Sequence, residues 1–156
     1  MSAALSRTPR LTLLGIGNEL NGDDAAGVLV VRGLRARLAP RPHLLLIEAG
    51  LAPEAFTAPL RRFAPDLVVL VDAALLEQPA GTVEMVDWRE TDGLSATTHT
   101  LPPSVLVQFI QHELGCPVEL ILIQPDDIEF DHPVSPAVKD TIDQVVDRLA
   151  ALLDPV

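Results

Sequence analysis

Residues 11–24 read LTLLGIGNELNGDD, an apolar run followed by a glycine-rich turn and two adjacent carboxylates. The apolar run predicts a buried strand, and the glycines allow positive φ angles and close approach of other groups to the backbone. Asp23 and Asp24 then come where a helix begins, and free N–H groups there favour negative charge. The segment predicts a strand, a tight loop and a helix start with Asp23 as its N-cap. Asp24 needs another explanation, because a second carboxylate beside the first costs repulsion unless something positive offsets it.

The Gly15-x-Gly17 pair after a strand has an alternative interpretation as a dinucleotide-binding fingerprint. The third glycine of that fingerprint is replaced by Leu20. A pyrophosphate would also meet two carboxylates at the helix start that should hold it. We therefore disfavour a nucleotide and expect this end of the strand to attract a cation.

Length and composition describe one globular domain. The chain has 156 residues, of which 48% are hydrophobic and 21% are charged. This length is typical of one domain, so we predict a single domain over residues 1–156, with residues 1–10 flexible. The net charge of −11 argues against nucleic acid or an anionic membrane surface as a partner, since both require a basic patch.

Cysteine content and hydropathy argue against a disulfide-bonded, cysteine–zinc or membrane protein. Cys116 is the single cysteine, so neither an intrachain disulfide nor a cysteine zinc cage can form. An uncharged apolar run of the ~18 residues needed to span a membrane is absent from the sequence, and so is a signal peptide. We expect a cytoplasmic protein.

Apolar runs alternate with amphipathic segments, which is typical of a layered α/β domain. Strands are predicted at the start of residues 11–24 and at residues 43–47, 67–71, 82–86 and 118–123. The strand at residues 82–86 is expected at an edge, in antiparallel orientation. Helices are predicted at residues 24–38, after Pro53, at residues 102–114 and after Ser135, which is expected to be an N-cap with Pro136 at the first helical position.

Acidic side chains follow the predicted strands at the edge where open α/β sheets bind ligands. They are Asp24, Glu48, Asp72, Asp126 and Asp127. His99 lies in the long polar loop at residues 89–100, between two threonines that can orient an imidazole. Two carboxylates and one imidazole suit nickel or zinc, and coordination chemistry alone does not choose between them. Asp72 as a turn former and His99 as a structural hydrogen bonder are the alternatives.

Four motifs together resemble those of the endopeptidases that mature nickel–iron hydrogenases, closest to the members that serve the hydrogenase of the formate hydrogenlyase system. They are Gly15-x-Gly17-Asn18-x-Leu20-x-x-Asp23-Asp24-x-x-Gly27, Val71-Asp72-Ala73, Thr97-Thr98-His99-x-x-Pro102 and Gln124-Pro125-Asp126. The resemblance implies a three-layer α/β/α sandwich around a mixed five-stranded sheet, in the order 2-1-3-5-4 with strand 4 antiparallel. It also implies a metal-binding trio of Asp24, Asp72 and His99.

The resemblance further implies that the metal is nickel, carried by the hydrogenase large-subunit precursor and not held permanently by the enzyme. The enzyme would cut off a C-terminal extension of that precursor just after a histidine or arginine. One motif departs from the family, because Glu48-Ala49-Gly50-Leu51 stands where relatives have Asp-Gly-Gly followed by Thr or Ser. A catalytic role for Glu48 is therefore the weakest of those carried over to this chain.

The sequence leaves the chemistry of cleavage open. A serine, cysteine or lysine nucleophile in a suitable setting is lacking, which favours attack by water on the scissile carbonyl. Nickel either activates that water or polarises the carbonyl, or it only anchors the precursor while Asp23 or Glu48 acts as general base. We favour the anchor, because precursor thiolates leave nickel few open positions.

Two other functions compete with the protease. A phosphoacceptor receiver domain also places paired acids after its first strand and an aspartate after its third, but it needs a lysine at its last strand, and the only lysine here is Lys139 in the final helix. A nickel-binding scaffold without protease activity would use the same three ligands. The expected partner is the precursor, and we expect the protein to be a monomer.

Overall fold

The computed structural model describes residues 7–87, 89, 95–96 and 103–154. Five strands form a mixed sheet in the order β2-β1-β3-β6-β4. They are β1 (Leu11–Ile16), β2 (Leu44–Gly50), β3 (Leu67–Leu75), β4 (Val83–Asp87) and β6 (Val118–Ile123). Strand β4 pairs antiparallel with β6, and the other neighbours pair in parallel. The predicted sheet is confirmed, β6 being its fifth strand. A two-residue strand that was not predicted, β5 (Ser95–Ala96), pairs antiparallel with the end of β3.

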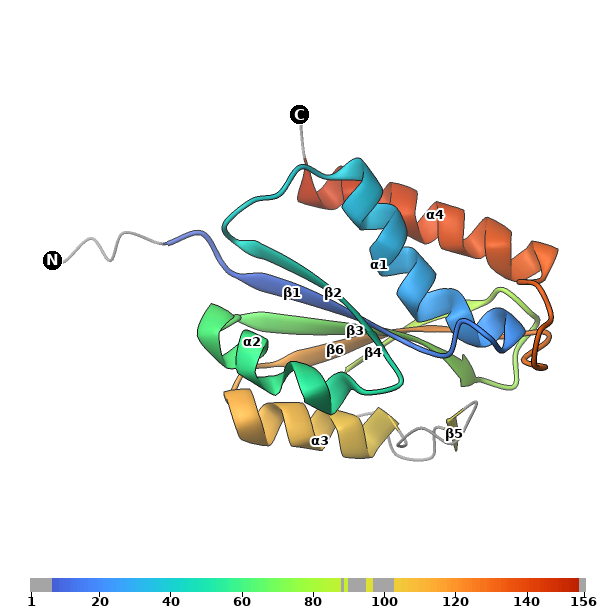
Figure 1. Cartoon of the computed structure of the whole chain (residues 1–156), viewed down its shortest axis with the longest axis horizontal. Helices are drawn as coiled ribbons and strands as arrows, with labels where there is room; N and C mark the ends of the chain where they lie inside the picture. Colours follow the sequence, from blue (N-terminus) through green and yellow to red (C-terminus); the bar gives the residue numbers. More distant parts are fainter. Residues whose placement is uncertain (1–6, 88, 90–94, 97–102, 155–156) are drawn as a thin grey trace, which may run out of the picture.

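The helices cover both faces of the sheet (Figure 1). Helices α1 (Ala26–Arg37) and α4 (Pro136–Leu153) lie on one face, and α2 (Thr57–Phe63) and α3 (Pro103–Leu114) lie on the other. Each pair of helices packs on its own apolar core, one with Val31, Val71 and Ile142 and the other with Leu70, Leu106 and Leu120. The three-layer α/β/α prediction is confirmed.

Two of the predicted helix starts contain a short 3-10 turn. Residues Gly22–Ala25 form η1 before α1, and residues Pro53–Phe56 form η2 before α2. Helix α4 begins after Ser135 with Pro136 in its first turn, as predicted. Its buried stripe follows helical spacing at Val138, Ile142 and Val145.

Glycines let α1 lie directly on the sheet. A Cβ atom on Gly27 would come within 2.0 Å of the Val71 carbonyl oxygen and 2.4 Å of that of Ile16. A Cβ atom on Gly15 would come within 2.4 Å of the Gly27 carbonyl oxygen. Backbones this close exclude any side chain. The start of α1, and η1 before it, are therefore held against the carboxyl ends of β1 and β3.

Two residues of the segment predicted to be flexible, Arg7 and Arg10, are hydrogen-bonded to Asp66. The Arg7 guanidinium donates to Asp66 at 2.9 Å through one nitrogen, and the Arg10 amide donates to the same carboxylate at 2.7 Å. These bonds lower the pKa of Asp66, with the Arg10 amide as the largest cause. Residues 1–6 lie outside the described part of the chain. In the part that the structure describes, every helix is too short or too polar to cross a membrane.

Candidate active site

Asp24 lies in η1 at the carboxyl end of the parallel strands. Its side chain is buried, with the residue 1% exposed, and the Asn18 amide donates to Oδ2 at 3.0 Å. Gly17 has φ of 142°, and a Cβ atom there would come within 1.8 Å of the Asp24 carbonyl oxygen. The loop between β1 and η1 can therefore wrap around Asp24 only with glycine at this position.

Asp72 lies on β3 beside Asp24. Its neighbours at alternate positions, Leu70 and Ala74, belong to the core under α2 and α3, so its side chain points to that face of the sheet. The Ala73 amide donates to its Oδ1 at 2.8 Å. Burial raises the pKa of Asp72 well above its usual range, and the charge of Asp24 raises it further. The structure thus brings together the two carboxylates that the sequence predicts as ligands, and their mutual repulsion favours a cation.

His99, the third predicted ligand, lies outside the described residues. Among the residues that are described, no group of three histidine, cysteine, aspartate or glutamate side chains could hold a metal ion. Three positions before His99, Ala96 on β5 pairs with Ala74, two residues after Asp72. Residues 95–96 therefore lie at the same end of β3 as Asp72.

Glu48 is not brought to the carboxylate pair. Its neighbours Ile47 and Ala49 pack in the core under α2 and α3, so Glu48 points to the opposite face, toward α1. There Arg32 bonds to Oε1 at 2.8 Å and Arg35 bonds to Oε2. Asp72 points to the other face, so the structure places Glu48 in an ion pair with α1 and not beside the carboxylate pair, and a catalytic role for Glu48 stays a prediction.

Asp23 is not the predicted N-cap, because Asn21 occupies that position of η1. The Asp23 carboxylate is fully buried and accepts four hydrogen bonds. The amides of Asp126 and Asp127 donate to Oδ2 at 2.8 and 2.9 Å. The Ser135 amide donates to Oδ1, and its hydroxyl donates to Oδ2, both at 2.7 Å. Asp23 therefore ties residues 126–135 to η1 and has little capacity left to act as a general base.

The other polar residues of this edge also hold loops. The side chain of Gln124 accepts from the Leu76 amide at 2.6 Å and donates to the Pro125 carbonyl at 3.0 Å. His132 bonds to Asp127 at 2.6 Å, which raises the pKa of the imidazole. The pKa of Asp127 is lowered chiefly by the Glu129 amide, which donates to Oδ1, and further by His132. The loop-holding roles of Asp23, Gln124 and Ser135 were missed at the level of sequence. A local signal could not reveal them, since Asp23 and Ser135 are 112 positions apart.

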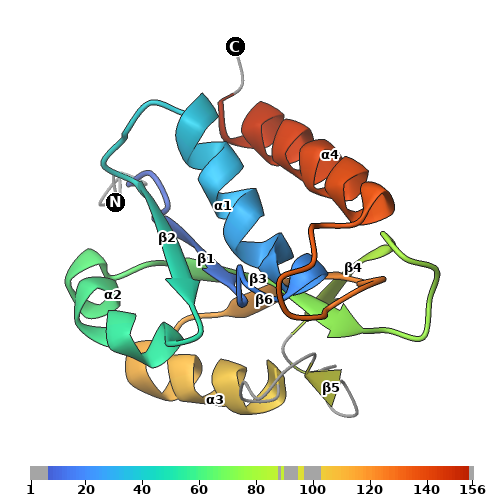
Figure 2. The ribbon, with the colours of Figure 1, turned by 45° about the vertical axis from the view of Figure 1, so that its right-hand side comes forward.

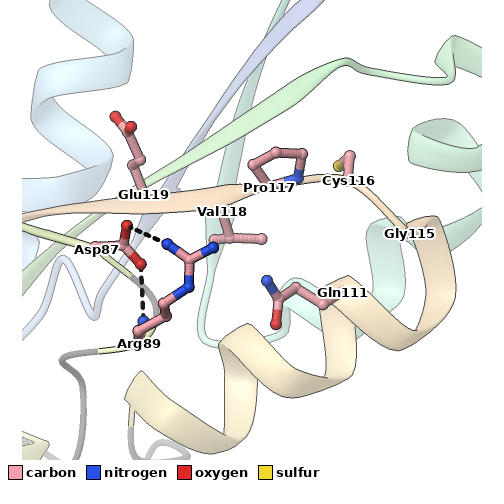
Figure 3. Close-up of a pocket in the computed structure, with 8 residues that line it drawn as sticks. All are labelled: Asp87, Arg89, Gln111, Gly115, Cys116, Pro117, Val118 and Glu119. Atoms are coloured by element: carbon pink, nitrogen blue, oxygen red, sulfur yellow. Dashed lines mark hydrogen bonds and ion pairs between the residues drawn. The ribbon is translucent and has the colours of Figure 1, made fainter.

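A separate cavity of about 430 Å³ opens at the opposite edge of the sheet, where β6 begins and β4 ends (Figure 3). It is lined by Asp87, Arg89, Gln111, Gly115, Cys116, Pro117, Val118 and Glu119. Asp87 accepts from the Arg89 amide at 2.9 Å. Burial raises the pKa of the Cys116 thiol, so this cysteine is a poor nucleophile. The cavity is therefore not a candidate for the cleavage site.

Comparison with known proteins identifies the family. The family described as hydrogenase maturation protease matches residues 28–152. A protein of Methanocaldococcus jannaschii named as a hydrogenase maturation protease is 33% identical over 156 residues, covering 96% of this chain and 92% of the relative. The crystal structure of the [NiFe] hydrogenase maturation protease HycI from Thermococcus kodakarensis KOD1 superposes with a TM-score of 0.84 at 32% identity, covering 96% of this chain and 95% of that one.

The solution structure of the endopeptidase HycI from Escherichia coli is also similar, with a TM-score of 0.80 at 29% identity. It covers 93% of this chain and 92% of that one. Sequence and fold thus agree over almost the whole length. The chain belongs to the hydrogenase maturation protease family and is a hydrogenase maturation endopeptidase.

Proposed function

We propose that the protein removes a C-terminal extension from the large-subunit precursor of a nickel–iron hydrogenase after nickel has been inserted. The observation that carries the proposal is the pair of carboxylates at the carboxyl edge of the sheet, the buried Asp24 and the half-buried Asp72. Two close carboxylates that are poorly solvated repel each other, and a bound cation offsets this repulsion. In this proposal the cation is the nickel ion of the precursor, so the enzyme recognises a precursor that already holds its metal.

His99 is proposed as the third ligand, from its place in the motif and from the pairing of β5 with β3. This set contains no thiolate, so it should bind free nickel weakly and nickel on precursor thiolates better. Isothermal titration calorimetry with nickel chloride, with and without a cysteine-containing precursor peptide, tests this expectation. Tight stoichiometric binding by the protein alone would support a nickel carrier instead.

Cleavage is proposed to proceed by attack of water on the scissile carbonyl, with nickel as the anchor of the precursor. Asp23 is occupied by four hydrogen bonds, and Glu48 is held by two arginines on the other face. The proton of the attacking water then goes to a carboxylate of the Asp24 and Asp72 pair. The same carboxylate then gives this proton to the departing amine as the C–N bond breaks, which completes the hydrolysis.

The direct test is mass spectrometry of nickel-loaded precursor incubated with the enzyme. The wild type should shorten the precursor at its C-terminus, and Asp72→Asn should abolish the mass loss. Asp140→Asn, an exposed carboxylate on α4, is the matched control and should retain activity. A precursor that is bound but never shortened by the wild type would favour the scaffold, and full activity of Asp72→Asn would reject the proposed site.

The variant His99→Ala distinguishes nickel as an anchor of the precursor from nickel as a participant in the cleavage chemistry. If nickel is the anchor, this variant should raise KM while kcat at saturating precursor stays largely intact. If nickel takes part in the chemistry, kcat itself should fall. The anchor proposal is rejected by a collapse of kcat with unchanged precursor binding.

A further inference from the structure

Four exposed apolar side chains lie at or beyond the carboxyl ends of the parallel strands. Leu20 follows β1, Leu51 follows β2, Leu75 ends β3 and Phe130 follows β6. Their exposed fractions are 61%, 51%, 44% and 71%, respectively. These four residues, called the apolar rim below, lie at the end of one of the four parallel strands or in the loop that follows it. Figures 1 and 2 show β1, β2, β3 and β6 running in the same direction. Parallel strands end at the same edge, so we place the rim at the edge that holds Asp24 and Asp72.

Hydrogen bonds fix the loops that carry the apolar rim. The Asp131 amide donates to the Leu20 carbonyl at 2.7 Å, which joins the loops of Leu20 and Phe130. The Gly17 amide donates to the Gly50 carbonyl at 3.0 Å, which holds the loop of Leu51 beside that of Asp24. Binding on a preorganised surface costs less conformational entropy than ordering free loops.

Exposed large apolar side chains are costly in water, and a cluster of them next to an active site is typical of an interaction surface. The same loops carry four exposed acidic residues, Glu19, Asp126, Glu129 and Asp131, of which Glu19 is paired with Arg32. The surface is therefore apolar with an acidic border. It complements a partner that presents apolar side chains among basic ones.

We propose that the apolar rim is the docking surface for the hydrogenase large-subunit precursor, an inference that rests on the proposed function. The segment to be cut must lie over Asp24 and Asp72, so the body of the precursor covers the loops around them. A second copy of this chain is disfavoured, because it would bring two acidic borders together in a protein with a net charge of −11. The surface of the precursor around its C-terminal segment is accordingly expected to be apolar and basic.

The test removes two rim side chains whose loss should not disturb the core. The double variant Leu20→Ser, Phe130→Ser keeps both loops, since the bond that joins them uses only backbone atoms. Met85→Ser, Leu152→Ser is the matched control, because these side chains are 71% and 74% exposed and lie on β4 and at the end of α4. Unchanged thermal melting of both proteins checks that they fold.

Cleavage of nickel-loaded precursor should show a KM raised about tenfold or more in the rim variant, with kcat at saturating precursor unchanged. The control should match the wild type. Binding to the same precursor is also measured in the Asp72→Asn protein, with and without the two rim substitutions. These substitutions should weaken precursor binding by a similar factor. Sedimentation should show the wild type as a monomer.

Equal KM and equal binding of the rim variant and the control would overturn the docking surface while leaving the proposed cleavage intact. Failure of the wild type to shorten a precursor that it binds through the rim would overturn the proposed function and not the surface. A wild-type dimer that the rim substitutions dissociate would also overturn the proposal, because the rim would then be covered by a second copy.

Discussion

Asp23→Ala should be strongly destabilising, although Asp23 neighbours a candidate catalytic residue and was a candidate for a simple helix cap. Its carboxylate accepts four hydrogen bonds in the folded protein, and alanine would leave all four donors without this partner. The amides of Asp126 and Asp127 are partly buried and can regain water. The amide and hydroxyl of Ser135 are buried and cannot easily do so.

The magnitude follows from these two classes of donor. Each buried unsatisfied donor costs about 1–3 kcal/mol, so the Ser135 groups together cost about 2–6 kcal/mol. We expect Asp23→Ala to lower the free energy of unfolding by about 4 kcal/mol. For a protein of this size, that corresponds to a fall in Tm of roughly 8–16 °C.

Urea unfolding followed by circular dichroism measures the change, and hydrogen exchange locates it. The amides of Asp126, Asp127 and Ser135 should exchange faster in the variant than other loop amides. Asp126→Ala is the matched control, because its exposed carboxylate lies next to the same network, and it should change stability by less than about 0.5 kcal/mol. A loss below about 1 kcal/mol for Asp23→Ala would refute the reasoning that this carboxylate holds residues 126–135 in place.

Asp72→Asn should stabilise the isolated protein by about 1–2 kcal/mol at pH 8 while abolishing cleavage. The pKa of Asp72 is raised in the folded protein, so its charged carboxylate opposes folding at high pH. The stabilisation by Asp72→Asn should therefore shrink as the pH falls toward 4, where the wild-type carboxylate becomes protonated. A stabilisation that grows on acidification would contradict this reasoning. Gly27→Ala should lower the free energy of unfolding by about 2–4 kcal/mol, because its Cβ meets two backbone carbonyls. Gly33→Ala is the control and should lower it less, since its Cβ meets only the side chain of Val146. Equal losses in the two variants would argue against the close packing of α1 on the sheet. The NMR titration of His132 should have a midpoint above 6.5 that falls in Asp127→Asn, and an unmoved midpoint would exclude the ion pair as its cause.

The sequence by itself was sufficient for the elements with strong local patterns. The Val/Leu run that begins at Leu67 predicts a buried strand because parallel strands are apolar on both faces, and β3 is such a strand. Pro136 after Ser135 predicts the start of α4, since proline fits only the first turn of a helix. Asp24 and Asp72 could be assigned to one edge because both follow strands that were expected to be parallel.

Contacts between distant segments decided the rest. Asp23 has the local pattern of an N-cap, yet its partners are Asp126, Asp127 and Ser135, which only the folded chain brings near. Glu48 looked equivalent to the other acids after strands, but alternation along β2 places its side chain on the α1 face. A short pattern determines how a segment prefers to fold, because propensity and periodicity act within a few residues. Which face a side chain takes and which donors it meets depend on strand register and helix docking, and these are properties of the whole sheet.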